Sequence, residues 1–199
     1  MGLNVAQKDD SMQDLDQTSP DPRPTLTTER LVLRPFQLSD AKRVQQLAGH
    51  ALVAATTATI PHPYPDGAAE AWINTHAKWF RLGQAAPFAI TLKSSQLLIG
   101  CIDLAIAAAH ARAELGYWMG VDYWSRGYCS EAATRVIDYG FRELHLNKIT
   151  SHHLGNNPAS GRVMAKAGMT KEGLLRKHFI KNGVVQDMEV YGLVREDLC

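Results

Sequence analysis

The chain has 199 residues, of which 45% are hydrophobic and 21% are charged, and its formal net charge is +1. A chain of this length and composition fits one globular domain with a sizeable core. The balanced charge, without long basic or acidic runs, excludes the charge patterns typical of proteins that bind nucleic acids or membrane surfaces.

The three cysteines are few, and none of them has Cys-x-x-Cys spacing. This argues against a disulfide framework or a structural zinc and favours a reducing compartment. The N-terminus lacks the apolar core of a signal peptide, and no apolar run approaches the about 20 residues of a membrane span. We therefore expect a cytoplasmic protein with no membrane partner and no direct nucleic-acid partner.

The start of the chain, residues 1–24, is rich in Asp, Gln, Ser and Pro. Such a segment buries too little apolar surface to order itself, so we predict a disordered tail followed by one domain over residues 25–199. That domain opens with an alternating stretch, 28–36, which is typical of a half-buried strand closed by Pro35.

Two helices are predicted after this strand. Ser39 and Asp40 are suited to cap the first helix, which carries apolar residues at helical spacing. Asp66 is suited to cap the second helix, which has an aromatic face. Between them, the proline-stiffened loop 60–67 either forms the wall of a substrate pocket or packs on the core.

Three strands are predicted in the middle of the chain, over residues 87–92, 97–106 and 113–119. Short loops join them, which indicates an antiparallel meander. A helix with one apolar stripe follows over about residues 130–144, and then a rather polar strand over residues 148–154.

The last part of the chain predicts a helix and a hairpin. Asn157 and Pro158 mark the start of the helix and Gly168 marks its end. Asn182-Gly183 lies between two strand patterns and is a type I′ turn signal. The complete order predicts a mixed α/β (α+β) fold with a single, mostly antiparallel sheet and about four helices.

The segment with the clearest functional signal is 117–133, where a strand pattern passes through a loop with one glycine into a helix. Unpaired backbone N–H groups and the positive end of the helix dipole then meet at one point, which favours an anion. A lone glycine is weak evidence, and the motifs for nucleoside triphosphates and dinucleotides are absent. However, the helix at Asn157 can open on the same side of the sheet. A groove between two splayed strands would then suit a long ligand that carries a diphosphate at one end.

The run from Glu114 to Ala132 resembles the acetyl-CoA-binding motif of the GNAT N-acetyltransferases, in particular the branch related to ribosomal-protein N-terminal acetyltransferases. The resemblance spans about residues 25–197 in one order. It implies a GNAT-like domain whose sheet is splayed at a V-shaped groove, with acetyl-CoA as co-substrate. The other matching segments are 28–34, 60–64, 146–149, 157–160, 167–169 and 172–173.

In that family the loop N–H groups hold the CoA pyrophosphate, and the pantetheine arm pairs with the preceding strand. The resemblance therefore assigns cofactor binding to Trp118, Met119, Gly120, Arg126, Gly127, Tyr128, Cys129, Ser130, Asn157 and Ser160. This chain departs from the family pattern at Cys129, where Gly or Ala is usual, and at Ser125, where Gly is common. Both side chains are small, so we expect binding to survive, with slight crowding of the phosphates by Cys129.

The resemblance also implies direct attack of an amine on the thioester, without a covalent enzyme intermediate. The amine must be neutral, and an α-amino group with a pKa of about 8 needs less help than a lysine or polyamine amine near about 10.4. Glu114 and His178 are candidates for a general base, although each could equally be structural. We expect the Met119 N–H to stabilise the oxyanion. We expect the Ser160 hydroxyl to give the leaving thiolate a proton or a hydrogen bond, although Ser160 could equally serve only to cap its own helix. Tyr191 is a weaker candidate acid.

Other reactive side chains carry less weight. His152 and His153 are neighbours on a strand and should point to opposite faces, so we expect no metal site. Cys129 begins a helix, where thiol pKa values fall, but a nucleophile would need a base beside it. Arg162 and Lys166 lie one turn apart and could meet the CoA phosphates.

The leading hypothesis is an acetyl-CoA-dependent N-acetyltransferase that acts on a protein N-terminal α-amino group, as a monomer or a homodimer. A second hypothesis keeps the chemistry and changes the acceptor to a small amine, such as a polyamine or an aminoglycoside-like molecule. A third is an acyl-CoA-binding module without turnover. We expect loops 50–70 and 176–188 to select the acceptor, but neither carries a readable code.

Overall fold

The computed structural model describes residues 23–198. The predicted tail therefore lies outside the described residues, except for Arg23 and Pro24 at its end. Arg23 is only 4% exposed, and its guanidinium donates a hydrogen bond to the carbonyl of Pro87. The chain is thus already packed against the domain at the first residue that the structure describes.

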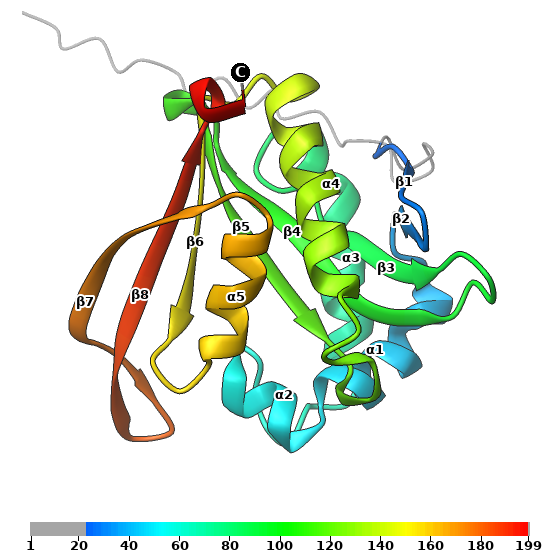
Figure 1. Ribbon diagram of the computed structural model, residues 1–199. Helices are drawn as coiled ribbons and strands as arrows, with labels where there is room; N and C mark the ends of the chain where they lie inside the picture. Colours follow the sequence, from blue (N-terminus) through cyan, green and yellow to red (C-terminus); the bar gives the residue numbers. More distant parts are fainter. Residues whose placement is uncertain (1–22, 199) are drawn as a thin grey trace, which may run out of the picture.

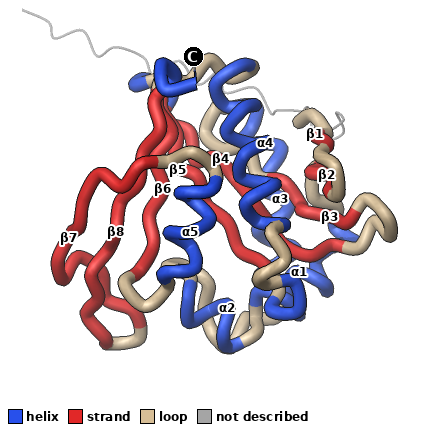
Figure 2. The backbone as a smooth tube through the Cα atoms, in the orientation of Figure 1, coloured by secondary structure: helices blue, strands red, loops and turns tan. Residues whose placement is uncertain are grey.

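The described residues form one eight-stranded sheet with helices on both faces (Figures 1 and 2). Four short 3-10 turns and five α-helices accompany it. In chain order the strands and α-helices are β1 (Leu26–Thr27), β2 (Leu31–Arg34), α1 (Ala41–Ala48), α2 (Ala51–Thr56), α3 (Ala68–Arg81), β3 (Phe88–Leu92), β4 (Leu98–Ala107), β5 (Arg112–Met119), α4 (Tyr128–Arg142), β6 (Lys148–Leu154), α5 (Pro158–Lys166), β7 (Thr170–Lys181) and β8 (Val184–Val194).

The strand order across the sheet is β1-β2-β3-β4-β5-β6-β8-β7. Every neighbouring pair is antiparallel except β5 and β6, which run parallel. The predicted mixed, mostly antiparallel sheet and the meander of its middle strands are therefore confirmed. The hairpin turn is also confirmed, because Asn182 and Gly183 both have positive φ, 50° and 77°.

The sequence analysis missed the helix α2. It has six residues, and its N-cap is His50, whose Nδ1 accepts the Leu52 N–H at 3.2 Å. Histidine is not among the residues that usually cap helices, and a helix this short has little periodicity to detect.

The predicted helix caps are only partly correct. Asp40 accepts the Gln37 N–H at 2.8 Å and forms an ion pair with Arg34, so it fixes the turn ahead of α1. Gly67, and not Asp66, occupies the N-cap of α3. In contrast, Asn157 caps α5 as predicted, because its side chain accepts the Ser160 N–H.

Each face of the sheet has its own core, because side chains alternate along a strand. Ile102 and Leu104 of β4 belong to the larger core under α4 and α5, whereas Cys101 belongs to the smaller one under α1 and α3. Figure 1 shows α4 and α5 on the near face and α3 on the far face. The two faces are therefore two separate environments that meet only where the sheet opens.

The sheet opens between β5 and β6. Their parallel pairing covers only three residue pairs, Arg112–Glu114 with Lys148–Thr150. Just beyond, the Ser151 hydroxyl donates to the Leu115 carbonyl at 2.7 Å, and the strands then diverge, as Figure 1 shows. The predicted splayed strands are thus present, and they leave the end of β5 free on one side.

Candidate functional site

A groove of about 530 Å³ lies where β5 and β6 separate. The end of β5, the loop before α4 and the first turns of α4 and α5 form one side of it. The other side is closed by α2 and the loop after it, which contribute Val53 and residues 56–60. This closing segment is tied to α5, because the Asn157 amide donates to the Thr56 carbonyl at 3.0 Å.

The loop between β5 and α4 has two residues in the left-handed region. Ser125 has φ 58°, and Gly127, the N-cap of α4, has φ 80°. The first helical hydrogen bond of α4 runs from the Glu131 N–H to the Gly127 carbonyl. The N–H groups of the residues before Glu131 therefore have no helical acceptor, and this end of α4 can bind an anion.

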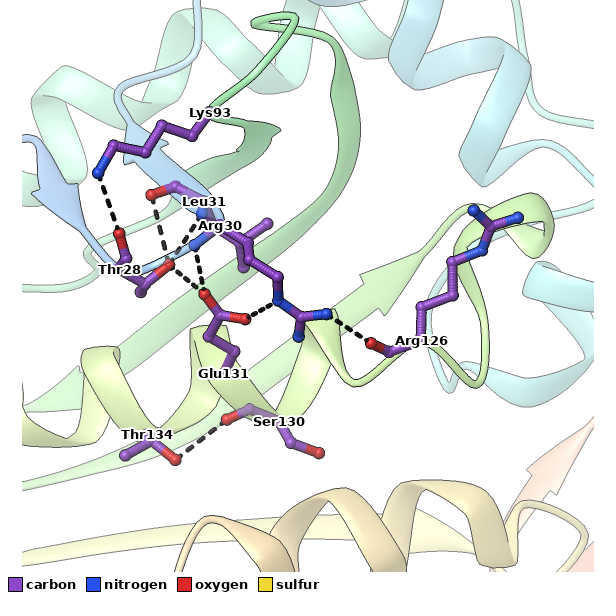
Figure 3. Close-up of polar contacts among 8 residues, drawn as sticks. All are labelled: Thr28, Arg30, Leu31, Lys93, Arg126, Ser130, Glu131 and Thr134. Carbon is purple, nitrogen blue, oxygen red and sulfur yellow. Dashed lines mark hydrogen bonds and ion pairs between the residues drawn. The ribbon is translucent and has the colours of Figure 1, made fainter.

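Residues from the start of the domain hold this loop in place (Figure 3). The Glu131 carboxylate accepts hydrogen bonds from the Thr28 hydroxyl and from the Arg30 N–H at 2.9 Å, and it forms an ion pair with Arg30 at 2.7 Å. Arg30 also donates to the Arg126 carbonyl at 3.1 Å and stacks over the Tyr128 ring. Because these contacts join the segment around residue 30 to both ends of the loop, they fix the geometry of the anion site.

Most of the sequence-predicted cofactor residues lie together along the groove. The residues among them that line it are Trp118, Met119, Gly127, Tyr128, Cys129, Ser130, Asn157 and Ser160. Gly120 and Arg126 do not line it. Arg126 contributes its carbonyl to Arg30, and its side chain extends away from the Arg30–Glu131 pair in Figure 3. The basic pair Arg162 and Lys166 does line the groove.

The Met119 backbone N–H points into the groove. The next residue, Gly120, donates its N–H to the Ile99 carbonyl of the neighbouring strand at 2.9 Å. Successive N–H groups of a strand point to opposite sides, so the Met119 N–H faces away from β4 and toward the gap. The Met119 N–H therefore has no acceptor on β4 and is available as a donor at the groove.

Ser160 lies at the groove beside a residue that the sequence analysis missed. The Tyr117 and Ser160 hydroxyl oxygens are 2.7 Å apart, and the Tyr117 hydroxyl also lies 3.0 Å from the Ser160 carbonyl. Burial is the main cause that raises the pKa of Tyr117 well above its usual range, so both hydroxyls stay protonated. The pair can donate one proton into the groove.

α5 packs very closely against β6 and β8 at Gly161. A methyl group at this position would lie 2.7 Å from His153 Nε2 and 2.9 Å from the Tyr191 hydroxyl oxygen. His153 is 6% exposed, and its Nδ1–H donates to the Leu154 carbonyl at 2.9 Å. Tyr191, the weaker candidate acid, thus lies in the packing beneath α5 and does not line the groove.

Cys129 is a poor candidate nucleophile. It is the second residue of α4, and burial raises the pKa of its thiol to about 12. This effect opposes the lowering expected at a helix N-terminus, and the thiol is therefore protonated at neutral pH. Its contribution to the groove is its size and not its charge.

The two candidate bases lie in different places. His178 is exposed on β7 and does not line the groove, whereas Glu114 does. Glu114 Oε1 is 3.1 Å from His152 Nδ1, and the hydrogen bond from His152 is the main cause that lowers the pKa of Glu114. A carboxylate held in this way is a weak base.

A smaller cavity of about 160 Å³ lies on the opposite face of the sheet, under α1 and α3. Four aromatic side chains line it: Tyr64, Trp72, Trp79 and Trp118. The single carboxylate in its wall belongs to Asp103 of β4. Asp103 and Trp118 also line the large groove, so the two spaces adjoin along these side chains.

Within residues 23–198, no cluster of three or more His, Cys, Asp or Glu side chains is arranged to hold a metal ion. His152 pairs with Glu114 on one face, and His153 packs under α5 on the other, as their adjacency predicted. In the same part of the chain, no helix is long and apolar enough to cross a membrane.

Comparison with known proteins places these features in a family context. The family model "Acetyltransferase (GNAT) domain" matches residues 30–170. The uncharacterized N-acetyltransferase YoaA of Bacillus subtilis is 32% identical over 173 residues, which cover 86% of this chain and 97% of that protein. The [ribosomal protein uS5]-alanine N-acetyltransferase of Escherichia coli is 26% identical over 88% of this chain and 93% of its own length.

A solved structure has the same architecture. The GNAT-family acetyltransferase from Bacillus anthracis aligns with a TM-score of 0.78 and 25% identity, covering 87% of this chain and 99% of the other. The similarity therefore covers most of this chain and nearly all of the other one.

Proposed function

This chain belongs to the GNAT acetyltransferase family, and we propose that it transfers the acetyl group of acetyl-CoA to the α-amino group of a protein N-terminus. Membership in the family makes it an acetyl-CoA-dependent acetyltransferase. The chemistry of the acceptor is our inference, and it depends on the shape and charge of the acceptor side of the groove.

We assign the large groove to acetyl-CoA. The first turn of α4, from Tyr128 to Ser130, would hold the pyrophosphate through its N–H groups, with Gly127 and Arg126 in the loop before it. The pantetheine arm would pair with the free side of Trp118–Gly120. Arg162 and Lys166 lie at the groove and add positive charge for the phosphates.

We assign the chemistry to groups around the end of the pantetheine arm. A neutral amine attacks the thioester carbon, and the Met119 N–H stabilises the developing oxyanion. The Ser160 hydroxyl, hydrogen-bonded to Tyr117, then gives a proton to the leaving thiolate. Asn157 keeps Ser160 in place, because its side chain accepts the N–H of that residue at 3.3 Å.

The observation that carries the acceptor assignment is the lining of the smaller cavity. It is aromatic, it has one carboxylate, Asp103, and it adjoins the groove at Trp118. The α-amino group of an N-terminal residue with a small side chain fits such a space. A polyamine would need several carboxylates, spaced like its own amino groups. The name of the Escherichia coli relative, which acts on an alanine of a ribosomal protein, is consistent with this acceptor.

Thiol release from acetyl-CoA tests the proposal. We would offer the full chain a panel of peptides with free N-termini, the same peptides with blocked N-termini, polyamines and aminoglycosides. We expect turnover with free N-termini that begin with small residues and none with the blocked peptides. Turnover of polyamines alone would contradict the assignment, and binding of CoA with no turnover of any amine would favour a non-catalytic module.

A further inference from the structure

We propose that Asp103 is the group that removes the proton from the acceptor amine, acting through one water molecule at the junction of the aromatic cavity and the groove. This inference rests on the proposed function, since it names the proton acceptor of the same reaction. It replaces Glu114 in the role that the sequence analysis suggested for that residue.

The position of Asp103 depends on a glycine in the neighbouring strand. Asp103 lies directly opposite Gly116 in the antiparallel pairing of β4 and β5. A methyl group at Gly116 would lie 2.6 Å from Asp103 Oδ1, so a larger residue there would move the carboxylate aside. Glycine at this point of β5 therefore leaves room for the carboxylate where it borders both spaces.

The surroundings of Asp103 disfavour its charged form. Burial and the negative charge of Glu114 raise the pKa of Asp103 to about 7. The titratable groups on the elements around it are Cys101 on its own strand, Glu114 and His152 on β5 and β6, Tyr64 in the cavity wall, His76 against Trp72, and Arg23 near Pro87.

Glu114 has the opposite character, although it lies on the same face one strand away. Its side chain is 51% exposed, and the hydrogen bond from His152 lowers its pKa. A base works best when its pKa is close to the working pH, so Asp103 is suited to this task and Glu114 is not.

The distance along β5 decides how Asp103 acts. Gly116 and Met119 are three residues apart, which is about 10 Å in a strand. This distance is too long for a direct hydrogen bond between Asp103 and an amine that attacks a thioester held at the Met119 N–H. The thioester, the amine and one bridging water together span it.

The proton balance of the step is complete. The amine nitrogen forms its bond to the acetyl carbon and gives one proton through water to the Asp103 carboxylate. The C–S bond breaks, and the thiolate takes a proton from Ser160. Solvent then restores both groups.

This base also fits the proposed acceptor. An α-ammonium group has a pKa of about 7.7–8.0, whereas a lysine or polyamine amine lies near about 10.4. Near neutral pH a sizeable fraction of an α-amino group is already neutral, so its attack releases only one proton, which Asp103 takes. A lysine or polyamine amine is almost wholly protonated and would need a second base before it could attack. The base and the cavity lining therefore select the same class of acceptor.

Two measurements on the full chain test the inference. In the first, the pH dependence of kcat/KM is compared for the wild type, Asp103→Asn and Glu114→Gln. The last variant removes the charge that helps to raise the pKa of Asp103, so it should keep the rise in activity and move it to lower pH. We expect Asp103→Asn to lower kcat/KM about 100-fold and to remove the rise in activity near pH 7. Its dissociation constant for acetyl-CoA should stay within about twofold, which also shows that it is folded. If Glu114→Gln removes the rise and Asp103→Asn keeps it, the inference is wrong.

The second measurement does not require turnover. The protein is labelled with ¹³C at the aspartate carboxyl carbons and titrated by NMR, with and without alaninamide as the amine probe in the presence of CoA. We expect one carboxyl that titrates near pH 7, is missing in Asp103→Asn, and shifts its midpoint downward when the amine binds. If the proposed function is wrong, the titration near pH 7 remains and only the shift with the amine is lost, whereas absence of such a carboxyl overturns the inference alone.

Discussion

The two sides of the groove are built in different ways. On the α4–α5 side, the site consists mainly of backbone N–H groups, held by local turns and by the contacts of Arg30 with Glu131 and Arg126. On the α1–α3 side, it consists of side chains, four of them aromatic and one a buried carboxylate. On the first side the only titratable side chains that we assign to binding are Arg162 and Lys166, which keep their charge, whereas on the second side the proposed chemistry depends on a carboxylate that changes its charge.

Under the proposed function, this difference follows from what each side would have to recognise. A pyrophosphate does not change during the reaction, so a rigid set of N–H groups at a helix N-terminus can bind it without a group that changes its charge. The acceptor must be recognised and also deprotonated, which requires a group that can change its charge. The following predictions test this contrast, in order of the expected effect on free energy.

The largest effect is expected from Gly161→Val on the α4–α5 side. The new side chain would overlap His153 and Tyr191, so α5 has to move away from the sheet. We expect the free energy of unfolding to fall by about 3 kcal/mol, as measured by urea denaturation. Gly173→Val is the control, because nothing lies within 4 Å of that position, and an equal loss there would show that the close packing at Gly161 is not the cause.

The next largest effect is a gain in stability from Asp103→Asn, and it depends on pH. The folded-state pKa of Asp103 is raised from 3.8 to about 7, so its favourable contribution is complete below pH 4 and is lost as pH rises through 7. The variant avoids this loss, and we expect it to be about 2 kcal/mol more stable than the wild type at pH 8, half of the limit set by the shift.

Thermal unfolding of both proteins at pH 4 and pH 8 measures this difference, which should vanish at pH 4. Glu114→Gln should behave in the opposite way. The folded-state pKa of Glu114 is lowered, so its contribution is present above its unfolded pKa and is lost as pH falls. If both variants changed the stability at pH 8 in the same direction relative to the wild type, the environments assigned to Asp103 and Glu114 would be wrong.

A smaller effect is expected at the hydroxyl pair. Tyr117→Phe and Ser160→Ala should each lower kcat about tenfold, or about 1.4 kcal/mol, with little change in KM for acetyl-CoA. The fold-loss in kcat of the double variant should be at most about twice that of either single variant, because the two hydroxyls share one hydrogen bond at 2.7 Å. Steady-state kinetics measure this, and an unchanged kcat in Ser160→Ala would remove that hydroxyl from the chemistry.

The smallest effect is expected at the support of the loop. Glu131→Gln weakens the ion pair with Arg30, which is 44% exposed, so we expect less than about 1 kcal/mol in stability. The KM for acetyl-CoA should rise a few-fold, because the loop loses its fixed geometry. Arg142→Gln breaks a comparable exposed pair far from the loop and should leave KM unchanged.

The cofactor side could be predicted from the sequence because its signals are local. The passage of a strand through a one-glycine loop into a helix, and the Asn157-Pro158 start of α5, are short patterns with a direct structural meaning. Positive φ at Ser125 also explains why glycine is common at this point of the motif.

The acceptor side could not be predicted, because its properties arise from contacts between distant parts of the chain. Asp103 is one polar residue in a strand pattern, and nothing nearby indicates that it lies over Gly116 or that its pKa is raised. The Tyr117 hydroxyl reaches a residue 43 positions away. The short helix α2 has a histidine cap and too few residues to show a period.

The short ladder between β5 and β6 has a mechanical consequence. Among the described residues it is the only strand pairing that joins the β1–β5 part of the sheet to the β6–β8 part, and it has three residue pairs. The two parts of the sheet can therefore move relative to each other about this short ladder. A ligand that contacts both Leu115–Met119 and β6 would restrict this motion while it is bound. We expect amide hydrogen exchange in Lys148–Leu154 to slow when CoA binds, because the cofactor would then link the two halves of the sheet across the groove.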